Sequence, residues 1–290
     1  MEVYKTLAEI PQDEFFTGGH GGCRGCGAAL AVRQAMKALG PRTIVTIPAS
    51  CMATIGGSGL STAWEIPFYH SLFECAPAVA SGIRAALDIQ GIKDVNVVSW
   101  AGDAGTADIG FQSLTGAAER QENIIHVCYD NETYMNTGGQ AGSVTPYQAV
   151  TPDTPAGKPT PRKDMLAIMA AHHPAYLATA SVAYPLDLIR KFQKARAIQG
   201  FRYIHILAPC FRGWGIREDQ TVQLARLAVE CGLWQLYEEI GGRRRVTVVP
   251  ERRIPVREYL RLQGRFKNME EAAVEALQAE ADRRFQEVQS

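Results

Sequence analysis

The sequence lacks an excess of charge of either sign. Its 290 residues include 30 lysines and arginines and 30 aspartates and glutamates, and no basic tract is interleaved with aromatic residues. Proteins that bind nucleic acids present a positive field to the phosphates. The sequence therefore argues against a nucleic-acid partner.

Long apolar runs are missing as well. No stretch approaches the ~20 consecutive apolar residues that span a bilayer, and residues 1–5 do not begin a basic segment followed by an apolar one. These absences predict a cytoplasmic protein without membrane contact. Seven cysteines, an odd number, do not suggest a disulfide framework in that compartment. Thiolate ligation of a metal centre explains some of them better.

Short runs rich in β-branched residues alternate with stretches of helical periodicity. Near-continuous apolar strands that alternate with helices are typical of a parallel sheet covered on both faces, so the sequence predicts an α/β fold. The expected strands are 43–47, 95–100, 124–129, 177–180 and 203–207, and the expected helices are 28–39, 76–90, 109–119, 163–172 and 185–198.

Two parts of the chain interrupt this alternation. Segment 136–161 has prolines at 146, 152, 155, 159 and 161, which exclude regular helix and central strand, and a loop of this length is usually functional or subunit-facing. We divide the chain into a main domain, 1–235, and a C-terminal helical extension, 236–290, which is expected to dock on another subunit. Further helices are expected at 219–231 and 268–286, and a strand at 245–249.

Asp103 and Asn131 each follow an expected strand and are 28 residues apart. Ligands of open parallel sheets bind at the carboxyl ends of the strands, where the next helix directs its N–H groups at an anion. The spacing fits one strand-helix-strand unit, so the two strand ends can share one magnesium ion, for which Asp103 supplies a hard oxygen ligand. The alternative is that both residues only cap helices. The spacing alone does not decide between them.

Cys23 and Cys26 form a C-x-x-C motif flanked by glycines, which lets two thiolates converge on one metal centre without crowding. The motif is ambiguous by itself. Three other cysteines are expected to be small buried hydrophobes: Cys75, Cys128 and Cys231. His20, before the motif, either orients this loop or is a structural histidine.

Four sequence blocks together resemble the β subunit of the 2-oxoacid:ferredoxin oxidoreductases, of which pyruvate:ferredoxin oxidoreductase is the best-known member. The resemblance covers about residues 15 to 235. The Asp103 to Asn131 spacing also resembles the thiamine diphosphate motif and departs from it at Ala104, where the family pattern has Gly. The blocks are GHGGCRGCG (19–27), GTADIG (105–110), CYDNETYMNTG (128–138) and APC (208–210).

The resemblance implies that 1–235 has a thiamine diphosphate-binding fold and also carries a [4Fe-4S] cluster. It implies that the cluster ligands are Cys23, Cys26, Cys51 and Cys210. It implies that the magnesium ligands are Asp103, the Asn131 side chain and the Thr133 carbonyl. The implied cofactor-binding residues are Ala28, Cys51, Gly102, Asp103, Ala104, Gly105, Thr106, Asn131, Thr133, Tyr134 and Asn136, of which Asn136 and Cys51 are the catalytic candidates. Ala28 stands where the family can have Glu, so a polar contact from that position is absent.

The activity implied by the resemblance is oxidative decarboxylation of a 2-oxoacid, with pyruvate as the default substrate and coenzyme A as the acyl acceptor. Electrons would pass through the cluster to ferredoxin or a similar acceptor. The implied partners are α and γ/δ-type subunits. One of them would contribute the glutamate that thiamine enzymes require, so the chain alone is expected to be inactive. Two alternatives stay open: a non-catalytic electron-transfer module, or an iron-free thiamine-dependent decarboxylase or carboligase.

Overall fold

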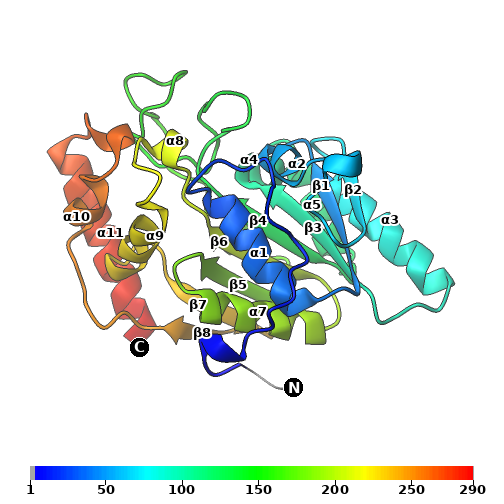
Figure 1. Cartoon of the computed structure of the whole chain (residues 1–290). Coiled ribbons are helices and arrows are strands. Elements are labelled where there is room, and N and C mark those ends of the chain that lie inside the picture. The colour runs from blue at the N-terminus through cyan, green and yellow to red at the C-terminus, as the bar shows by residue number, and fades with distance from the viewer. Residues whose placement is uncertain (1–3, 290) are drawn as a thin grey trace.

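The computed structural model describes residues 4–289, which form one eight-stranded sheet in the order β2-β1-β3-β4-β6-β5-β7-β8 (Figure 1). The neighbours from β2 to β5 in this order are parallel, and β7 and β8 add antiparallel pairs. The predicted α/β fold is confirmed. The strands are β1 (Thr43–Pro48), β2 (Phe68–Ser71), β3 (Asn96–Gly102), β4 (Ile125–Asp130), β5 (Tyr176–Ser181), β6 (Arg202–Leu207), β7 (Leu236–Ile240) and β8 (Arg243–Val248).

Helices cover both faces of the sheet because successive strand residues point to opposite sides. In β3, Val98 and Trp100 face the helices α1 (Gly27–Leu39) and α7 (Pro185–Ala197). Val97 faces the opposite layer instead. That layer contains α3 (Ala76–Ile89), α5 (Phe111–Glu119) and α6 (Met165–Ala170).

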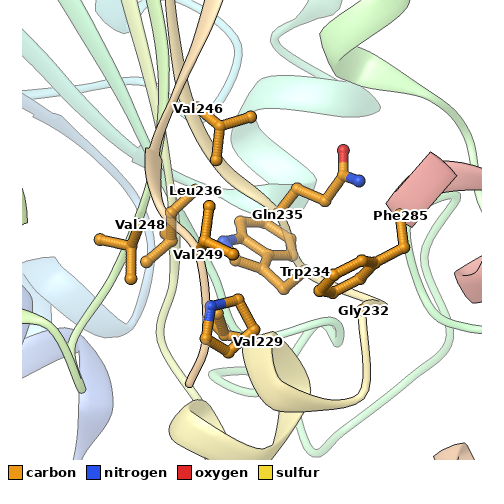
Figure 2. A pocket seen from close by; sticks show the side chains of 10 residues that line it. Val229, Gly232, Trp234, Gln235, Leu236, Val246, Val248, Val249 and Phe285 are labelled. Carbon is orange, nitrogen blue, oxygen red and sulfur yellow. The ribbon is translucent and has the colours of Figure 1, made fainter. Parts of the chain in front are cut away.

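The C-terminal part forms a third buried cluster beside the β5-β7-β8 end of the sheet. Phe285 and Trp234 line a small apolar pocket there (Figure 2), whose volume of about 20 Å³ has room for little more than one water molecule. The helix that carries Phe285 is therefore tied to the sheet. The elements of this part are α8 (Phe211–Trp214), α9 (Thr221–Glu230), α10 (Val256–Leu260), η3 (Gly264–Phe266) and α11 (Glu271–Gln289). The division at residue 235 stays a prediction, and the two strands that follow it continue the sheet.

Several elements differ from the sequence-based expectations. The helix expected over 163–172 is shorter, because Asp164 caps it at the N-terminus by accepting the Ala167 N–H at 3.0 Å. The strands β2 and β7 were not expected. Seven short helices of the described residues were not expected either: η1 (Leu7–Glu9), α2 (Cys51–Gly56), η2 (Gly59–Ser61), α4 (Asp103–Ala107), α8, α10 and η3. Within the described residues, no helix is both long and apolar enough to cross a membrane.

Candidate active site

The two residues expected at strand ends lie at the same edge of the sheet. Asp103 opens α4 directly after β3, and Asn131 follows the last residue of β4. The strands β3 and β4 are parallel neighbours, with Gly102 opposite Tyr129. The fold therefore brings Asp103 and Asn131 to adjacent strand ends, as their spacing predicts.

The Asp103 carboxylate is incompletely satisfied. Its side chain is 3% exposed, and its Oδ2 has no hydrogen-bond partner within the described chain. Burial, and then the neighbouring Asp130 carboxylate, raise the pKa of Asp103 well above its ordinary value. A buried carboxylate oxygen without a partner is costly. A divalent cation bound by Asp103 would remove this cost, so the residue fits the predicted magnesium site.

Asn131 and Thr133 offer further oxygen ligands beside Asp103. Both are buried, and Asn131 Oδ1 accepts the Thr133 N–H at 3.2 Å. The Thr133 carbonyl accepts the Met135 N–H at 2.8 Å and has a second lone pair to offer. Carboxylate, amide and carbonyl oxygens are the ligands that magnesium prefers. Only one of the three is a carboxylate, and the described part of the chain holds no cluster of three or more His, Cys, Asp or Glu side chains around a single ion.

Gly102 and Gly105 keep the start of α4 free of side chains. A Cβ at Gly102 would lie 3.2 Å from the Tyr129 hydroxyl oxygen, and a Cβ at Gly105 would lie 3.3 Å from the Phe73 ring. Both contacts are tighter than ordinary van der Waals distance. The backbone of this turn therefore stays open to a close approach by a phosphate.

Ala104 and Thr106 fill the remaining positions of the motif. Ala104 is not among the residues with positive φ, so the departure from the family glycine causes no backbone strain. The Thr106 hydroxyl forms a hydrogen bond with His126 Nε2 at 3.1 Å inside the core. For Thr106, the backbone rather than the side chain is the part that can bind a cofactor.

Tyr134 and Asn136 lie on the chain that leaves this turn. The Tyr134 ring is edge-on to Phe73, with 6.2 Å between the ring centroids, and burial, followed by Asp108, raises the pKa of Tyr134. Asn136 Oδ1 accepts the Thr54 hydroxyl at 3.2 Å. Because Thr54 belongs to α2, this hydrogen bond ties Asn136 to the helix that begins with Cys51, a predicted cluster ligand.

Backbone contacts bring the three cysteine segments together. The Gly21 N–H donates to a carbonyl of α2 at 2.9 Å, which joins the C-x-x-C loop to the helix that opens with Cys51. The Gly27 N–H donates to the Pro209 carbonyl at 3.3 Å, which joins the same loop to the segment before Cys210. Segments that are far apart in the sequence thus meet around one point.

The four thiols influence one another electrostatically. Burial, followed by Cys210, Cys26, Asp103 and Cys23, raises the pKa of Cys51 to about 12. Burial is also the main cause of the raised pKa of Cys26 and of Cys210. In a [4Fe-4S] cluster each thiolate binds a different iron, so the four sulfurs need not surround a single ion. The arrangement fits a cluster, and Cys51 is near enough to Asp103, the predicted magnesium ligand, for the two side chains to interact electrostatically.

Helices begin at three of these cysteines. Cys26 is the N-cap of α1, although its side chain accepts no capping hydrogen bond, and the Ala28 methyl two residues later is buried in the core. Cys210 is the N-cap of α8, and its Sγ accepts the Gly213 N–H at 3.5 Å. Cys51 is the first residue of α2. N–H groups at helix starts favour thiolates over thiols.

His20 connects the cysteine loop to Phe16. Its Nδ1 accepts the Gly22 N–H at 3.1 Å, and its ring stacks on Phe16 with 5.4 Å between the centroids. The three remaining cysteines lie in other segments. Cys128 and Cys231 are buried as expected, whereas the expectation is wrong for Cys75, which is half-buried at the start of α3.

Replacing Gly27 with Ala is expected to lower the free energy of unfolding by about 1–3 kcal/mol. The added Cβ would lie 2.7 Å from the Ala208 carbonyl carbon and from the Pro209 oxygen, which are backbone atoms without freedom to turn aside. Gly82 in α3 is the control, because a Cβ there meets nothing within 4 Å. Urea unfolding compares the two variants. If Gly27→Ala were as stable as Gly82→Ala, the loop and the Pro209 segment would not be in contact.

Sequence reasoning missed a group of charged residues next to the turn of residues 131–133, which carries two of the predicted magnesium ligands and is called the magnesium turn below. Asp130 is fully buried, and burial would raise its pKa, but Arg162 and His205 outweigh burial and lower the pKa of Asp130 to about 2. His205 Nε2 lies 2.7 Å from Asp130 Oδ2. Glu132 pairs with Arg162 and with Arg265. No local motif in the sequence signals these long-range partners.

Comparison with known proteins adds independent information. The family model described as thiamine pyrophosphate enzyme, C-terminal TPP binding domain, matches residues 51–206. The pyruvate synthase subunit PorB of Methanothermobacter marburgensis is 50% identical over 97% of this chain and 99% of that protein. The ketoisovalerate oxidoreductase subunit VorB of Pyrococcus furiosus is 43% identical over 96% of this chain and 93% of that protein.

A solved structure shares the fold. The 2-oxoglutarate:ferredoxin oxidoreductase from Magnetococcus marinus superimposes with a TM-score of 0.61 at 23% sequence identity, covering 77% of this chain and 82% of that chain. At this level of identity the likeness concerns the fold alone. It agrees with the sheet and helix layers described above.

Proposed function

This chain belongs to the β subunits of the 2-oxoacid:ferredoxin oxidoreductases, and from that premise we propose that it binds thiamine diphosphate, magnesium and a [4Fe-4S] cluster in a heteromeric enzyme. The enzyme oxidatively decarboxylates a 2-oxoacid and passes the electrons through the cluster to ferredoxin or a similar acceptor. Coenzyme A takes the acyl group. The other components are α and γ/δ-type subunits.

The observation that carries this proposal is the position of Cys51. Besides burial, the other three cysteines of the set and Asp103 raise the pKa of its thiol. The N–H of the next residue, Met52, donates to the Tyr129 hydroxyl of β4 at 3.2 Å, which ties α2 to the strand that leads to Asn131. A cluster held by these thiols would therefore lie beside a diphosphate held at the strand ends.

Different residues of the chain would bind the metal ion, the diphosphate and the reacting part of the cofactor. Asp103, the Asn131 side chain and the Thr133 carbonyl would hold magnesium, and the turn that starts at Gly102 and ends at Thr106 would receive the diphosphate. Bound thiamine diphosphate supplies the electron sink for decarboxylation. Asn136 would face the reacting part of the cofactor, and Cys51 would place the cluster beside it.

We propose a small 2-oxoacid as the substrate, and the names of the relatives support this choice. Subunits named for pyruvate synthase match at 40–50% identity, and subunits named for ketoisovalerate oxidoreductase match at 43–45% identity. Pyruvate is the substrate we propose, because the relatives named pyruvate synthase reach the higher identity. A branched-chain 2-oxoacid is the alternative.

One catalytic group comes from a partner subunit. Thiamine enzymes use a glutamate on the aminopyrimidine ring, and the glutamate of the magnesium turn, Glu132, is instead engaged by Arg162 and Arg265. We therefore assign the catalytic glutamate, the one that contacts the aminopyrimidine ring, to the α-type subunit. The chain alone is incomplete for catalysis.

The co-purified complex is expected to reduce a low-potential dye with pyruvate and coenzyme A, whereas the isolated chain, reconstituted with iron, sulfide, magnesium and thiamine diphosphate, is expected to show no turnover. A panel of pyruvate, 3-methyl-2-oxobutanoate, 2-oxoglutarate and an aryl 2-oxoacid, each with and without coenzyme A, identifies the substrate. Full activity of the isolated chain would contradict the assignment of the glutamate. Inactivity of the complex with every 2-oxoacid would contradict the proposed function.

A further inference from the structure

Glu132 has an uncommon backbone conformation for its residue type. It lies between Asn131 and Thr133, two of the magnesium ligands proposed above, and its φ is +62°. Residues other than glycine rarely adopt this left-handed region, because their Cβ crowds the neighbouring carbonyl. The surrounding structure must therefore hold Glu132 in place.

Close packing alone does not hold this residue. A cavity of about 430 Å³ lies against Glu132 and is also lined by Arg162, His205, Trp234 and Arg265. Protein interiors normally leave few spaces larger than a water molecule, and side chains beside such a space have room to move. The position of the Glu132 carboxylate is therefore set by its charged partners.

Two arginines from distant segments bind this carboxylate, one at each oxygen. Arg162 Nη1 donates to Oε1 at 2.5 Å, and Arg265 Nη2 donates to Oε2 at 2.5 Å. Glu132 is 6% exposed and Arg265 is 4% exposed. Water screens the buried pair of Glu132 and Arg265 weakly. Removing Arg265 leaves Oε2 of a buried carboxylate without its charged partner, while Arg162 stays on Oε1.

Arg265 also contacts the helix that carries a proposed iron ligand. Its guanidinium carbon lies 3.9 Å from the centroid of the Trp214 ring, and the Trp214 indole N–H donates to the Asn131 carbonyl at 2.8 Å. Trp214 is the last residue of α8, whose N-cap is Cys210. One guanidinium therefore touches both the cluster helix and the glutamate of the magnesium turn.

The backbone of η3 fixes Arg265 in this position. The Gly264 N–H donates to the Gly215 carbonyl at 3.2 Å, and a Cβ at Gly215 would lie 3.1 Å from Gly264 Cα. The Arg265 carbonyl accepts the Val150 N–H at 2.8 Å, which ties η3 to the long loop. The arginine thus projects from a segment that is itself anchored at two places.

We propose that Arg265 is a positioning residue for the cofactor site. By holding Glu132 against α8, it keeps the turn from Asn131 to Thr133 in the geometry that binds magnesium and, through magnesium, the diphosphate. The inference rests on the proposed function. It makes the C-terminal segment, which lies outside the thiamine-family match at 51–206, a working part of that site.

Arg265→Gln in the full chain, co-purified with its partner subunits, is expected to weaken magnesium-dependent binding of thiamine diphosphate by about tenfold to a hundredfold, because a charged hydrogen bond to Glu132 is lost. The complex is stripped with a chelator and titrated with thiamine diphosphate in a calorimeter at several magnesium concentrations. Raising the magnesium concentration should restore binding, since the change acts on the metal turn. A general loss of folded protein would not be restored in this way.

Matched variants separate this role from a general effect on folding. Arg253→Gln is the control, because Arg253 is also in the C-terminal part but pairs with Asp282 and lies over the Phe285 ring, 4.5 Å from its centroid. The Arg253→Gln complex is expected to bind thiamine diphosphate with the parent affinity. Glu132→Gly relaxes the backbone but cannot bind the arginines, and it is expected to bind as weakly as Arg265→Gln. If Arg265→Gln does not fold, Arg265→Lys keeps the charge with fewer donors, and about tenfold weaker binding is expected.

Each outcome bears on a different claim. Parent-like binding by Arg265→Gln, by Glu132→Gly or by the substitute Arg265→Lys would overturn the positioning role and leave the proposed function intact. Absence of thiamine diphosphate binding by the parent complex would overturn the proposed function itself.

Discussion

Replacing Asp103 with Asn is expected to lower turnover of the assembled enzyme by about a thousandfold, which corresponds to about 4 kcal/mol. Asn keeps the size of the side chain and one acceptor oxygen, but it has no charge to offer magnesium. The charge is lost from the one carboxylate in the proposed ligand set, whose Oδ2 is buried without a partner in the described chain. Dye reduction with the preferred 2-oxoacid, measured across a magnesium titration, tests this expectation.

The same substitution separates a metal ligand from a helix cap. Asn caps helices as well as Asp does, so a residue that only capped α4 would tolerate the change. Asp164 provides the control, because its side chain accepts the Ala167 N–H and caps α6. Asp164→Asn is expected to keep full turnover. If Asp103→Asn also kept full turnover, the chain would act as an electron-transfer module without a catalytic diphosphate site.

The stability of the metal-free chain gives a second measurement for this variant. Asp103 and Asp130 are two buried carboxylates that disfavour each other's charge. Asp103→Asn removes one of them, so the free energy of unfolding without magnesium is expected to rise by about 1 kcal/mol. If the variant has a higher free energy of unfolding than the parent and yet a lower turnover, its loss of activity is not caused by misfolding.

The central strands could be predicted from the sequence because they are apolar on both faces. β3 and β4 are near-continuous runs of buried residues: only the first residue of β3 is partly exposed, and all residues of β4 are buried. The edge strand β2 is half-exposed and has the sequence Phe-Tyr-His-Ser, and β7 ends in two glutamates and an isoleucine. Neither carries the apolar pattern of a central strand. Their places in the sheet follow from tertiary pairing that local sequence does not encode.

Local sequence signals predict only those parts of the candidate site whose residues are close in the chain, and Cys51 and Cys210 come from the family resemblance alone. The strand-end position of Asp103 and the glycines around Cys23 and Cys26 are local signals. Arg265 is 133 residues from its partner Glu132, and nothing near Arg265 in the sequence marks it as different from the other arginines of this part. Long-range ion pairs of this kind become visible only once the fold has joined the segments.

Replacing Cys51 with Ala is expected to abolish the iron-sulfur cluster and, with it, dye reduction by the assembled enzyme. Burial, followed by Cys210, Cys26, Asp103 and Cys23, raises the pKa of its thiol, so Cys51 would join the proposed cluster site to the proposed diphosphate site. A [4Fe-4S] cluster needs a ligand at each iron. The purified variant should lose the broad visible absorbance, the four irons per chain and the paramagnetic signal of the reduced cluster.

Cys75→Ala is the matched control, because Cys75 is half-buried at the start of α3 and belongs to none of the three cysteine segments that meet around the site. It is expected to keep iron and turnover. If Cys51→Ala kept turnover and the parent complex contained no iron, the cysteines would be incidental and the chain would belong to an iron-free thiamine enzyme. If iron were kept but turnover lost, Cys51 would serve the cofactor rather than the cluster. Measuring iron and turnover on the same preparations decides among these outcomes, because only a cluster ligand beside the cofactor loses both together.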